Sequence, residues 1–259
     1  MSFEDSWAAL HLDMPSRVPR TEYSADFHWP LVEAVTGRKG LAEASPDGQA
    51  LASREFTEAW EYAFIWSTLV HADEFGPWRT RMGHAEYQPN KVDWDPTVGS
   101  PFSSSEEVLS FRPTELLAFP GHAAAVKRFN VHYLANQASH PQSVAMTGIY
   151  VTCVSGLIDL FGWDLLLGAI GDDPERMGAL TNDYCRWMQQ WFDALADSEA
   201  PVVMVHDDLV WSSGAIFSPS WYREFVFPSY RRLIHPLVEA GKRIIFTADG
   251  DYTIFIDDI

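Results

Sequence analysis

Residues 201–208 read Pro-Val-Val-Met-Val-His-Asp-Asp, an apolar run that ends in a histidine and two carboxylates. A run of apolar residues without polar alternation is typical of a strand buried on both faces, as in a parallel sheet. A second such strand is expected at residues 243–246, and the sequence Thr-Ala-Asp-Gly-Asp follows it. Functional groups of α/β proteins gather at the carboxyl ends of parallel strands, so both acidic exits are candidate site segments.

A helix is expected between these two strands. Ser218 is a suitable N-cap, and Pro219 fits the first helical position, where its missing N–H costs nothing. Pro228 and Pro236 are expected to break or kink the helix, and Gly241 is a natural cap at its end. The order strand, helix, strand predicts a right-handed βαβ unit.

The composition favours a folded protein with a large core. Of the 259 residues, 47% are hydrophobic, and the net charge is −18. This charge argues against nucleic-acid and anionic-membrane partners, because both need a basic surface. Cys153 and Cys185 do not have the spacing of a metal or redox motif, and we find neither a signal peptide nor a run of about 20 apolar residues. We therefore expect a soluble, cytoplasmic protein with buried free thiols.

We expect a single domain over residues 1–259. Residues 1–140 are expected to form an N-terminal elaboration and the first units of the fold, and residues 141–259 regular βα units. The expected helices lie at about 45–62, 121–137 and 173–196, and further strands at 63–66 and 143–151. A complete eightfold barrel typically takes roughly 250 residues, and we can place only four or five strands. The sequence therefore predicts a (β/α)8-type barrel, a TIM barrel, that is incomplete at its C-terminus, with an unpaired edge at residues 243–246.

A series of short motifs runs along the chain. The motifs are Arg17-Val18-Pro19-Arg20, Gly148 with Thr152, Asp172-Asp173-Pro174-Glu175, His206-Asp207-Asp208, Ile216-Phe217-Ser218-Pro219, Pro228-Ser229-Tyr230-Arg231 and Asp249-Gly250. Their order and spacing resemble the uroporphyrinogen decarboxylase family, which also includes corrinoid-dependent methyltransferases. The similarity is strongest over residues 143–259. It implies a (β/α)8 barrel with the site in its mouth.

The chain lacks residues that are typical of both activities in the family it resembles. The arginine-rich segment by which the decarboxylases hold substrate carboxylates has no match, and only Arg17 and Arg20 are available to replace it. The tyrosine that the decarboxylases carry falls at Gly156. The zinc-dependent methyltransferases have His-x-Cys where this chain has Thr-Ala-Asp at residues 247–249. Because these three residues make a poor tetrahedral zinc site, we expect neither a metal site nor a cofactor, and zinc stays open as an alternative although its usual ligand pattern is absent.

The candidate catalytic residues are His206, Asp207 and Asp208. The two aspartates are neighbours on an extended chain, so one side chain faces the mouth and the other caps a backbone amide. An aspartate beside an arginine stays ionised, whereas one in an apolar mouth is available as a general acid, and the sequence leaves both roles open. His206 is either an acid–base group or a structural histidine.

Eight further residues are candidates for substrate binding. They are Arg17, Arg20, Arg79, Arg81, His84, Tyr150, Asp249 and Asp251. The arginines and His84 would hold substrate carboxylates, and Tyr150 would line the pocket at a strand end. The side chains of Asp249 and Asp251 would lie on the same side of the chain after the second strand. Besides binding substrate, the two carboxylates could share a proton or hold a Mg²⁺ ion.

The resemblance implies an enzyme that decarboxylates a carboxylated, tetrapyrrole-like substrate by carboxylate and histidine acid–base chemistry. In such a reaction an aspartate stabilises the cation that forms when the pyrrole is protonated. Two alternatives stay open: a methyltransferase that acts with a corrinoid protein, and a protein that binds a tetrapyrrole or corrinoid without converting it. A homodimer is compatible with the sequence.

Overall fold

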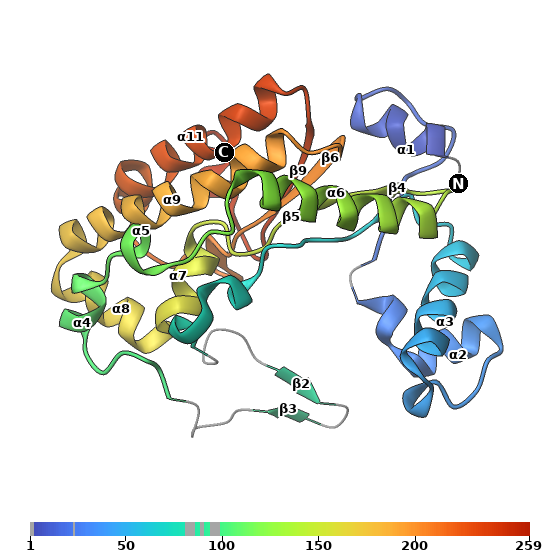
Figure 1. Cartoon of the computed structure of the whole chain (residues 1–259), viewed down its shortest axis with the longest axis horizontal. Helices are drawn as coiled ribbons and strands as arrows, with labels where there is room; N and C mark the ends of the chain where they lie inside the picture. Colours follow the sequence, from blue (N-terminus) through green and yellow to red (C-terminus); the bar gives the residue numbers. More distant parts are fainter. Residues whose placement is uncertain (1–2, 23, 81–85, 89–90, 94–98) are drawn as a thin grey trace.

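The computed structural model describes residues 3–22, 24–80, 86–88, 91–93 and 99–259. Two predicted site residues, Arg81 and His84, lie outside this part of the chain. The helices are α1 (Phe3–Leu10), α2 (Trp29–Thr36), α3 (Pro46–Ala59), α4 (Ser105–Ser110), α5 (Pro113–Leu116), α6 (His122–Ser139), α7 (Val154–Phe161), α8 (Trp163–Asp172), α9 (Pro174–Ala196), α10 (Pro219–Trp221) and α11 (Phe227–Glu239). The expected helices at 45–62, 121–137 and 173–196 correspond to α3, α6 and α9 (Figure 1).

Parallel strands follow one another in chain order. β1 (Phe64–Ile65) pairs with β4 (Val144–Ala145), β5 (Thr147–Ile149) pairs with β6 (Val202–His206), and β6 pairs with β9 (Arg243–Thr247). An isolated parallel bridge between Val70 and Ile149 continues the first pairing. This order is that of successive strands in a βα barrel. The described residues contain no closed barrel.

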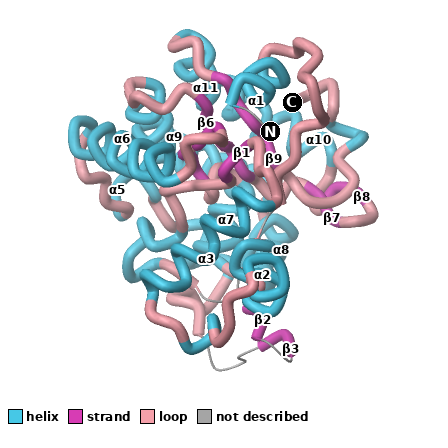
Figure 2. Tube along the Cα trace, turned by 90° about the vertical axis from the view of Figure 1, so that its right-hand side faces the viewer, coloured by secondary structure: helices cyan, strands magenta, loops and turns pink. Residues whose placement is uncertain are grey.

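Two antiparallel hairpins lie outside this parallel array. The first joins β2 (Glu86–Gln88) to β3 (Lys91–Asp93), and the second joins β7 (Val210–Trp211) to β8 (Gly214–Ala215). In both views the β2–β3 hairpin lies at the opposite end of the molecule from α11 (Figures 1 and 2).

Two expected elements differ in detail from the structure. The single strand expected at 143–151 is divided into β4 and β5 at Met146. The helix after Ser218 is interrupted before Pro228, where a π-helical turn, Tyr222–Val226, separates α10 from α11. Because proline donates no hydrogen bond, a change of register just before it is the natural response. Pro236, in contrast, lies inside α11 without ending it.

The core lies mainly between the sheet and the helices that connect its strands. Every residue of β6 is buried, and α9 contributes Tyr184, Trp187 and Trp191, each fully buried. The other face of the sheet is covered by α1, whose Trp7 packs beside Met146, Val202 and Met204. Both faces of β6 are therefore buried, as its unbroken apolar run predicts.

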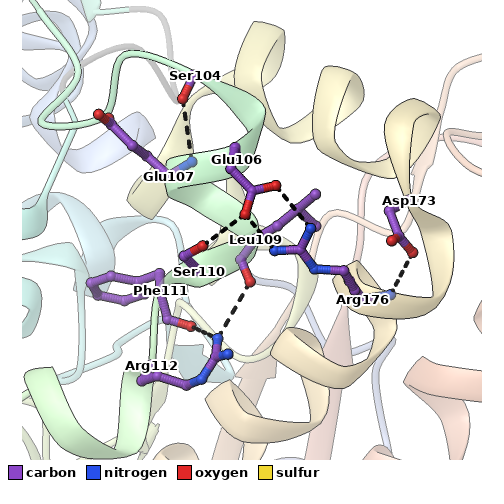
Figure 3. Close-up of polar contacts among 9 residues, drawn as sticks. All are labelled: Ser104, Glu106, Glu107, Leu109, Ser110, Phe111, Arg112, Asp173 and Arg176. Carbon is purple, nitrogen blue, oxygen red and sulfur yellow. Dashed lines mark hydrogen bonds and ion pairs between the residues drawn. The ribbon is translucent and has the colours of Figure 1, made fainter.

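One ion pair joins α4 to α9, and each of the two helices has its own N-cap (Figure 3). Ser104 accepts a hydrogen bond from the Glu107 N–H, 3.3 Å away, and Asp173 accepts one from the Arg176 N–H, 2.9 Å away. The two guanidinium nitrogens of Arg176 each donate to an oxygen of Glu106, both at 2.8 Å. These contacts fix the start of both helices and hold them together.

No single helix among the described residues is long and apolar enough to cross a membrane. Within the described part of the chain, α7 and α8 taken together meet such a test of length and composition, but the pair is bent by 108°.

Candidate functional site

Tyr150, His206 and Thr247 follow or end three neighbouring strands. β5 pairs with β6 so that Ile149 lies opposite Val205, and His206 lies opposite Thr247 of β9. Tyr150 is the residue directly after Ile149. The three side chains therefore lie side by side at the carboxyl edge of the sheet, where βα proteins carry their sites. We call them the strand-end row.

His206 is held in a defined orientation within the strand-end row. Its Nδ1 lies 3.0 Å from the backbone carbonyl oxygen of Tyr150, and its ring stacks on the Tyr150 ring at 3.9 Å between centroids and 5° between planes. A carbonyl only accepts hydrogen bonds, so Nδ1 carries the proton and Nε2 of the neutral ring is an acceptor. This Nε2 lies 3.5 Å from Oδ1 of Asp208. A proton taken up by Nε2 would therefore be stabilised by a carboxylate.

Asp207 is fully buried and receives three hydrogen bonds. The backbone N–H groups of Val154 and Ser155 donate to its carboxylate at 3.0 and 2.6 Å, and the hydroxyl of Tyr230 donates to it as well. Burial raises the pKa of Asp207, while the hydrogen bonds from Tyr230, Ser155 and Val154 act in the opposite direction. Asp207 therefore caps the N-terminal end of α7 from a neighbouring strand.

Asp208 is the member of the pair that faces the strand-end row. Its own N–H donates to Oγ of Ser155 at 2.8 Å, and its side chain is 19% exposed beside His206. The two aspartates therefore have different partners: Asp207 caps backbone amides, and Asp208 approaches His206.

His71 belongs beside the strand-end row, and the sequence reasoning missed it. It directly follows Val70, whose bridge to Ile149 extends the first strand pair. Its ring lies 5.4 Å from that of Tyr150, and its Nε2 lies 3.0 Å from Oγ1 of Thr68. The signal was present in the sequence, because Leu69-Val70-His71 repeats the pattern of an apolar strand end followed by histidine.

Two of the predicted arginines, Arg17 and Arg20, do not lie at this edge. Arg17 forms an ion pair with Glu61, and Arg20 donates to the carbonyl of Trp60 and lies over its ring at 4.9 Å. The backbone carbonyl of Arg20 accepts from the N–H of Ala63, just before β1 begins. Both arginines therefore lie at the amino end of β1, whereas His206 lies at the carboxyl edge. Arg79 is paired with Asp73.

The two aspartates after β9 are exposed. Asp251 accepts a hydrogen bond from the N–H of Thr253 at 3.1 Å, and hydrogen bonding from Thr253 lowers the pKa of Asp251. Their part in substrate binding stays a prediction, as does that of the arginines.

The donor groups near β9 do not fit a tetrahedral zinc ion. Thr247 Oγ1 is buried without a hydrogen-bond partner among the described residues, Asp249 is exposed, and Nδ1 of His206 is already bonded to a carbonyl. Across the described ranges, no three or more His, Cys, Asp and Glu side chains are grouped as metal ligands. Cys153 and Cys185 are buried free thiols with Sγ atoms 3.3 Å apart, and hydrogen bonding with Cys185 and burial raise the pKa of the Cys153 thiol.

Two comparisons with known proteins find matches to this chain. The model of the Uroporphyrinogen decarboxylase (URO-D) family matches residues 86–259. The chain belongs to this family. Among solved structures, a methyltransferase from Methanosarcina mazei is similar with a TM-score of 0.57 and 13% identity, over 100% of this chain and 73% of that one. No curated protein sequence matches the chain.

The URO-D family and the structural neighbour both imply a TIM-barrel type of fold, in agreement with the order of the parallel strands. The strand-end row lies at the edge of the sheet where barrels of this type place their sites. The resemblance noted from the sequence motifs is thereby confirmed at the level of the family.

Proposed function

We propose that this member of the URO-D family is an enzyme that decarboxylates a carboxylated, tetrapyrrole-like substrate, with His206 and Asp208 as its acid–base pair. The observation that carries the proposal is the orientation of His206. Its Nδ1 is fixed by the Tyr150 carbonyl, and its Nε2 is directed toward Asp208 at 3.5 Å. Such an arrangement delivers and recovers a proton at one defined atom.

The proposed reaction needs a proton donor and a group that stabilises a cation. His206 first takes up a proton at Nε2 beside Asp208 and then donates it to a pyrrole carbon, and the Asp208 carboxylate stabilises the ring cation that results. The carbon–carbon bond to the substrate carboxylate then breaks, its electron pair neutralises the ring, and CO2 leaves. A proton added to the side-chain carbon, and return of the first proton from the ring carbon to Nε2 of His206, restore the pyrrole and complete the exchange of CO2 for hydrogen. No cofactor takes part.

Asp207 has a positioning role in this proposal. Its carboxylate holds the first amides of α7, and Ser155 of the same helix accepts from the N–H of Asp208. The start of α7 therefore sets the direction in which Asp208 points.

The test is turnover of a uroporphyrinogen-type substrate, followed by CO2 release, with His206→Gln and Asp208→Asn. Loss of an acid–base group lowers kcat by about 10²–10⁴-fold, and we expect that loss in both variants. Glu115→Gln, which removes an exposed carboxylate on α5 away from the strand ends, is the matched control and should retain full kcat. Full turnover by His206→Gln and Asp208→Asn would overturn the proposal.

A second candidate is methyl transfer with a corrinoid protein, which the similarity to a methyltransferase favours. The same purified protein is incubated with methylcobalamin and a thiol acceptor, with and without added zinc. Methyl transfer without CO2 release would select this alternative. Quenching of porphyrin fluorescence without any product would instead indicate a protein that only binds its ligand.

A further inference from the structure

A cavity of about 910 Å³ lies away from the strand-end row. It is lined by α3, by the segment around η1 (Ala25–Phe27), by β1 and the two residues after it, and by the end of α6. Its volume is in the range of small-molecule sites in proteins. None of the residues that line it belongs to the row formed by Tyr150, His206 and Thr247.

The charged side chains of this cavity are mostly acidic. Glu22, Asp26 and Asp47 line it, against a single guanidinium, that of Arg54. His140 also lines it, and burial lowers the pKa of His140, so this ring is neutral at pH 7. The cavity therefore has an excess of negative charge, which favours a cation.

Tyr62 supplies a buried polar atom without a partner. The residue is 4% exposed, it lines the cavity, and its hydroxyl has no hydrogen-bond partner among the described residues. Burial, and then the charges of Asp26 and Glu22, raise the pKa of Tyr62 to about 12, so the hydroxyl is neutral and both carboxylates lie near it. An unpaired buried hydroxyl is costly, and a ligand that hydrogen-bonds to it recovers that cost.

Aromatic rings form the apolar part of the cavity. Phe27, Trp29 and Trp66 line it, and the Phe27 and Trp29 rings meet edge to face at 6.4 Å between centroids. The face of an indole attracts an organic cation, whereas an inorganic cation keeps its water and gains little from such walls.

We propose that this cavity is a binding site for a protonated primary amine with an apolar body, such as an arylalkylammonium ion. The ammonium group lies by Asp26 and donates a hydrogen bond to the Tyr62 hydroxyl, and the apolar body lies against Trp29 and Trp66. A quaternary ammonium ion has the same charge but no N–H, so it leaves the hydroxyl unpaired. The site is separate from the proposed decarboxylation.

The first test compares isosteric probes by isothermal titration calorimetry at pH 7 with the whole chain. Benzylamine, which is protonated at this pH, is expected to bind at millimolar concentration or below. Benzyl alcohol is expected to bind at least about tenfold more weakly, which corresponds to about 1.4 kcal/mol. Benzoate is expected not to bind. Equal binding of benzylamine and benzyl alcohol, or no binding of benzylamine, would overturn the proposal.

The second test uses variants whose folding is checked by their melting temperature. Asp26→Asn should weaken benzylamine binding by about tenfold, as expected for loss of a charged partner. Tyr62→Phe should weaken benzylamine but leave benzyltrimethylammonium unchanged, because only the first has N–H groups. Glu43→Gln, which removes an exposed carboxylate of the short helix Leu41–Glu43 that does not line the cavity, is the matched control. An Asp26→Asn variant that binds like Glu43→Gln would contradict the assignment.

Discussion

At the scale of single residues, neighbouring aspartates have different environments. Asp207 is fully buried against the amides of α7 and the Tyr230 hydroxyl, whereas Asp208 is partly exposed and lies beside His206. A carboxylate that accepts several hydrogen bonds in the interior cannot be removed without leaving its donors unpaired. Substitution of Asp207 should therefore lower the stability of the fold, whereas substitution of Asp208 should leave the stability nearly unchanged.

Asp207→Ala is expected to lower the free energy of unfolding by about 3–5 kcal/mol, because it leaves two buried amides and a buried hydroxyl without an acceptor. Denaturant unfolding followed by circular dichroism measures this loss. Asp208→Asn should change the same quantity by less than about 1 kcal/mol, as is usual for partly exposed positions. If Asp207→Ala unfolds at the same denaturant concentration as the wild type, the capping role is wrong.

Gly148 lies where two neighbouring strands are packed too closely for any side chain. A Cβ at this position would lie 1.8 Å from the carbonyl oxygen of Met204 on the neighbouring strand. Gly148→Ala should therefore prevent folding or lower the melting temperature strongly, since backbone cannot give way as a flexible side chain does. Gly171→Ala in α8, where a Cβ meets nothing within 4 Å, is the control and should stabilise the helix slightly. Similar melting temperatures for the two variants would contradict this packing.

At the scale of elements, the contacts between α4 and α9 show how sequence-distant helices are aligned. Arg176 lies one turn after the Asp173 cap, and its guanidinium reaches both oxygens of Glu106 (Figure 3). Hydrogen bonding from Arg176, and then from Ser110, lowers the pKa of Glu106 to about 2. The ion pair is fully solvated, so its contribution to stability is small.

The lowered pKa of Glu106 predicts a pH dependence with a defined sign. A carboxyl whose pKa is lower in the folded state contributes stability above its unfolded value of 4.5 and loses it as the pH falls toward about 2. Melting temperatures measured between pH 2 and 6 should therefore fall more steeply in the wild type than in Glu106→Gln. Glu115→Gln, which changes an exposed carboxylate on α5, should follow the wild-type curve. Parallel curves for Glu106→Gln and the wild type would contradict the prediction.

At the scale of the whole molecule, the two outer strands are covered to different degrees. The outer edge of β1 is met by the preceding chain, since the N–H of Ala63 donates to the carbonyl of Arg20. Along β9, Arg243 donates to Pro201 and Thr247 accepts from Asp207, so the backbone groups of Ile244 and Phe246 point away from β6. Among the described residues, no strand pairs with this second edge of β9.

An open edge of this composition is expected to associate. Residues 244–247 are only half-buried, whereas every residue of β6 is buried. Dye binding and light scattering should therefore reveal exposed apolar surface and concentration-dependent association of the purified chain. Ile244→Pro removes one outward N–H while leaving the bonds to β6, so it should reduce association. A sharp, reversible melt of a monomer that binds no dye would contradict the expectation.

Much of the fold could be predicted from local patterns. Three features depend only on interactions within a few residues, so the sequence reveals them. They are the apolar run before His206, the helix caps at Ser218 and Asp173, and the regular spacing of apolar residues along one side of α9. Division of the strand at Met146 could not be foreseen, because it depends on how β4 and β5 pair with different partners.

The sequence by itself determined that a buried parallel strand ends at His206 and is followed by Asp207 and Asp208, and its motifs indicated the family. Only the tertiary structure decided that Asp207 caps α7, that Asp208 approaches His206 and that His71 lies beside the Tyr150 ring. It also decided that Arg17 and Arg20 lie at the amino end of β1, away from the carboxyl edge that carries His206. The physical reason is distance along the chain. The Val154 amide that Asp207 binds lies 53 residues away, and such a contact exists only after β5, β6 and β9 have paired.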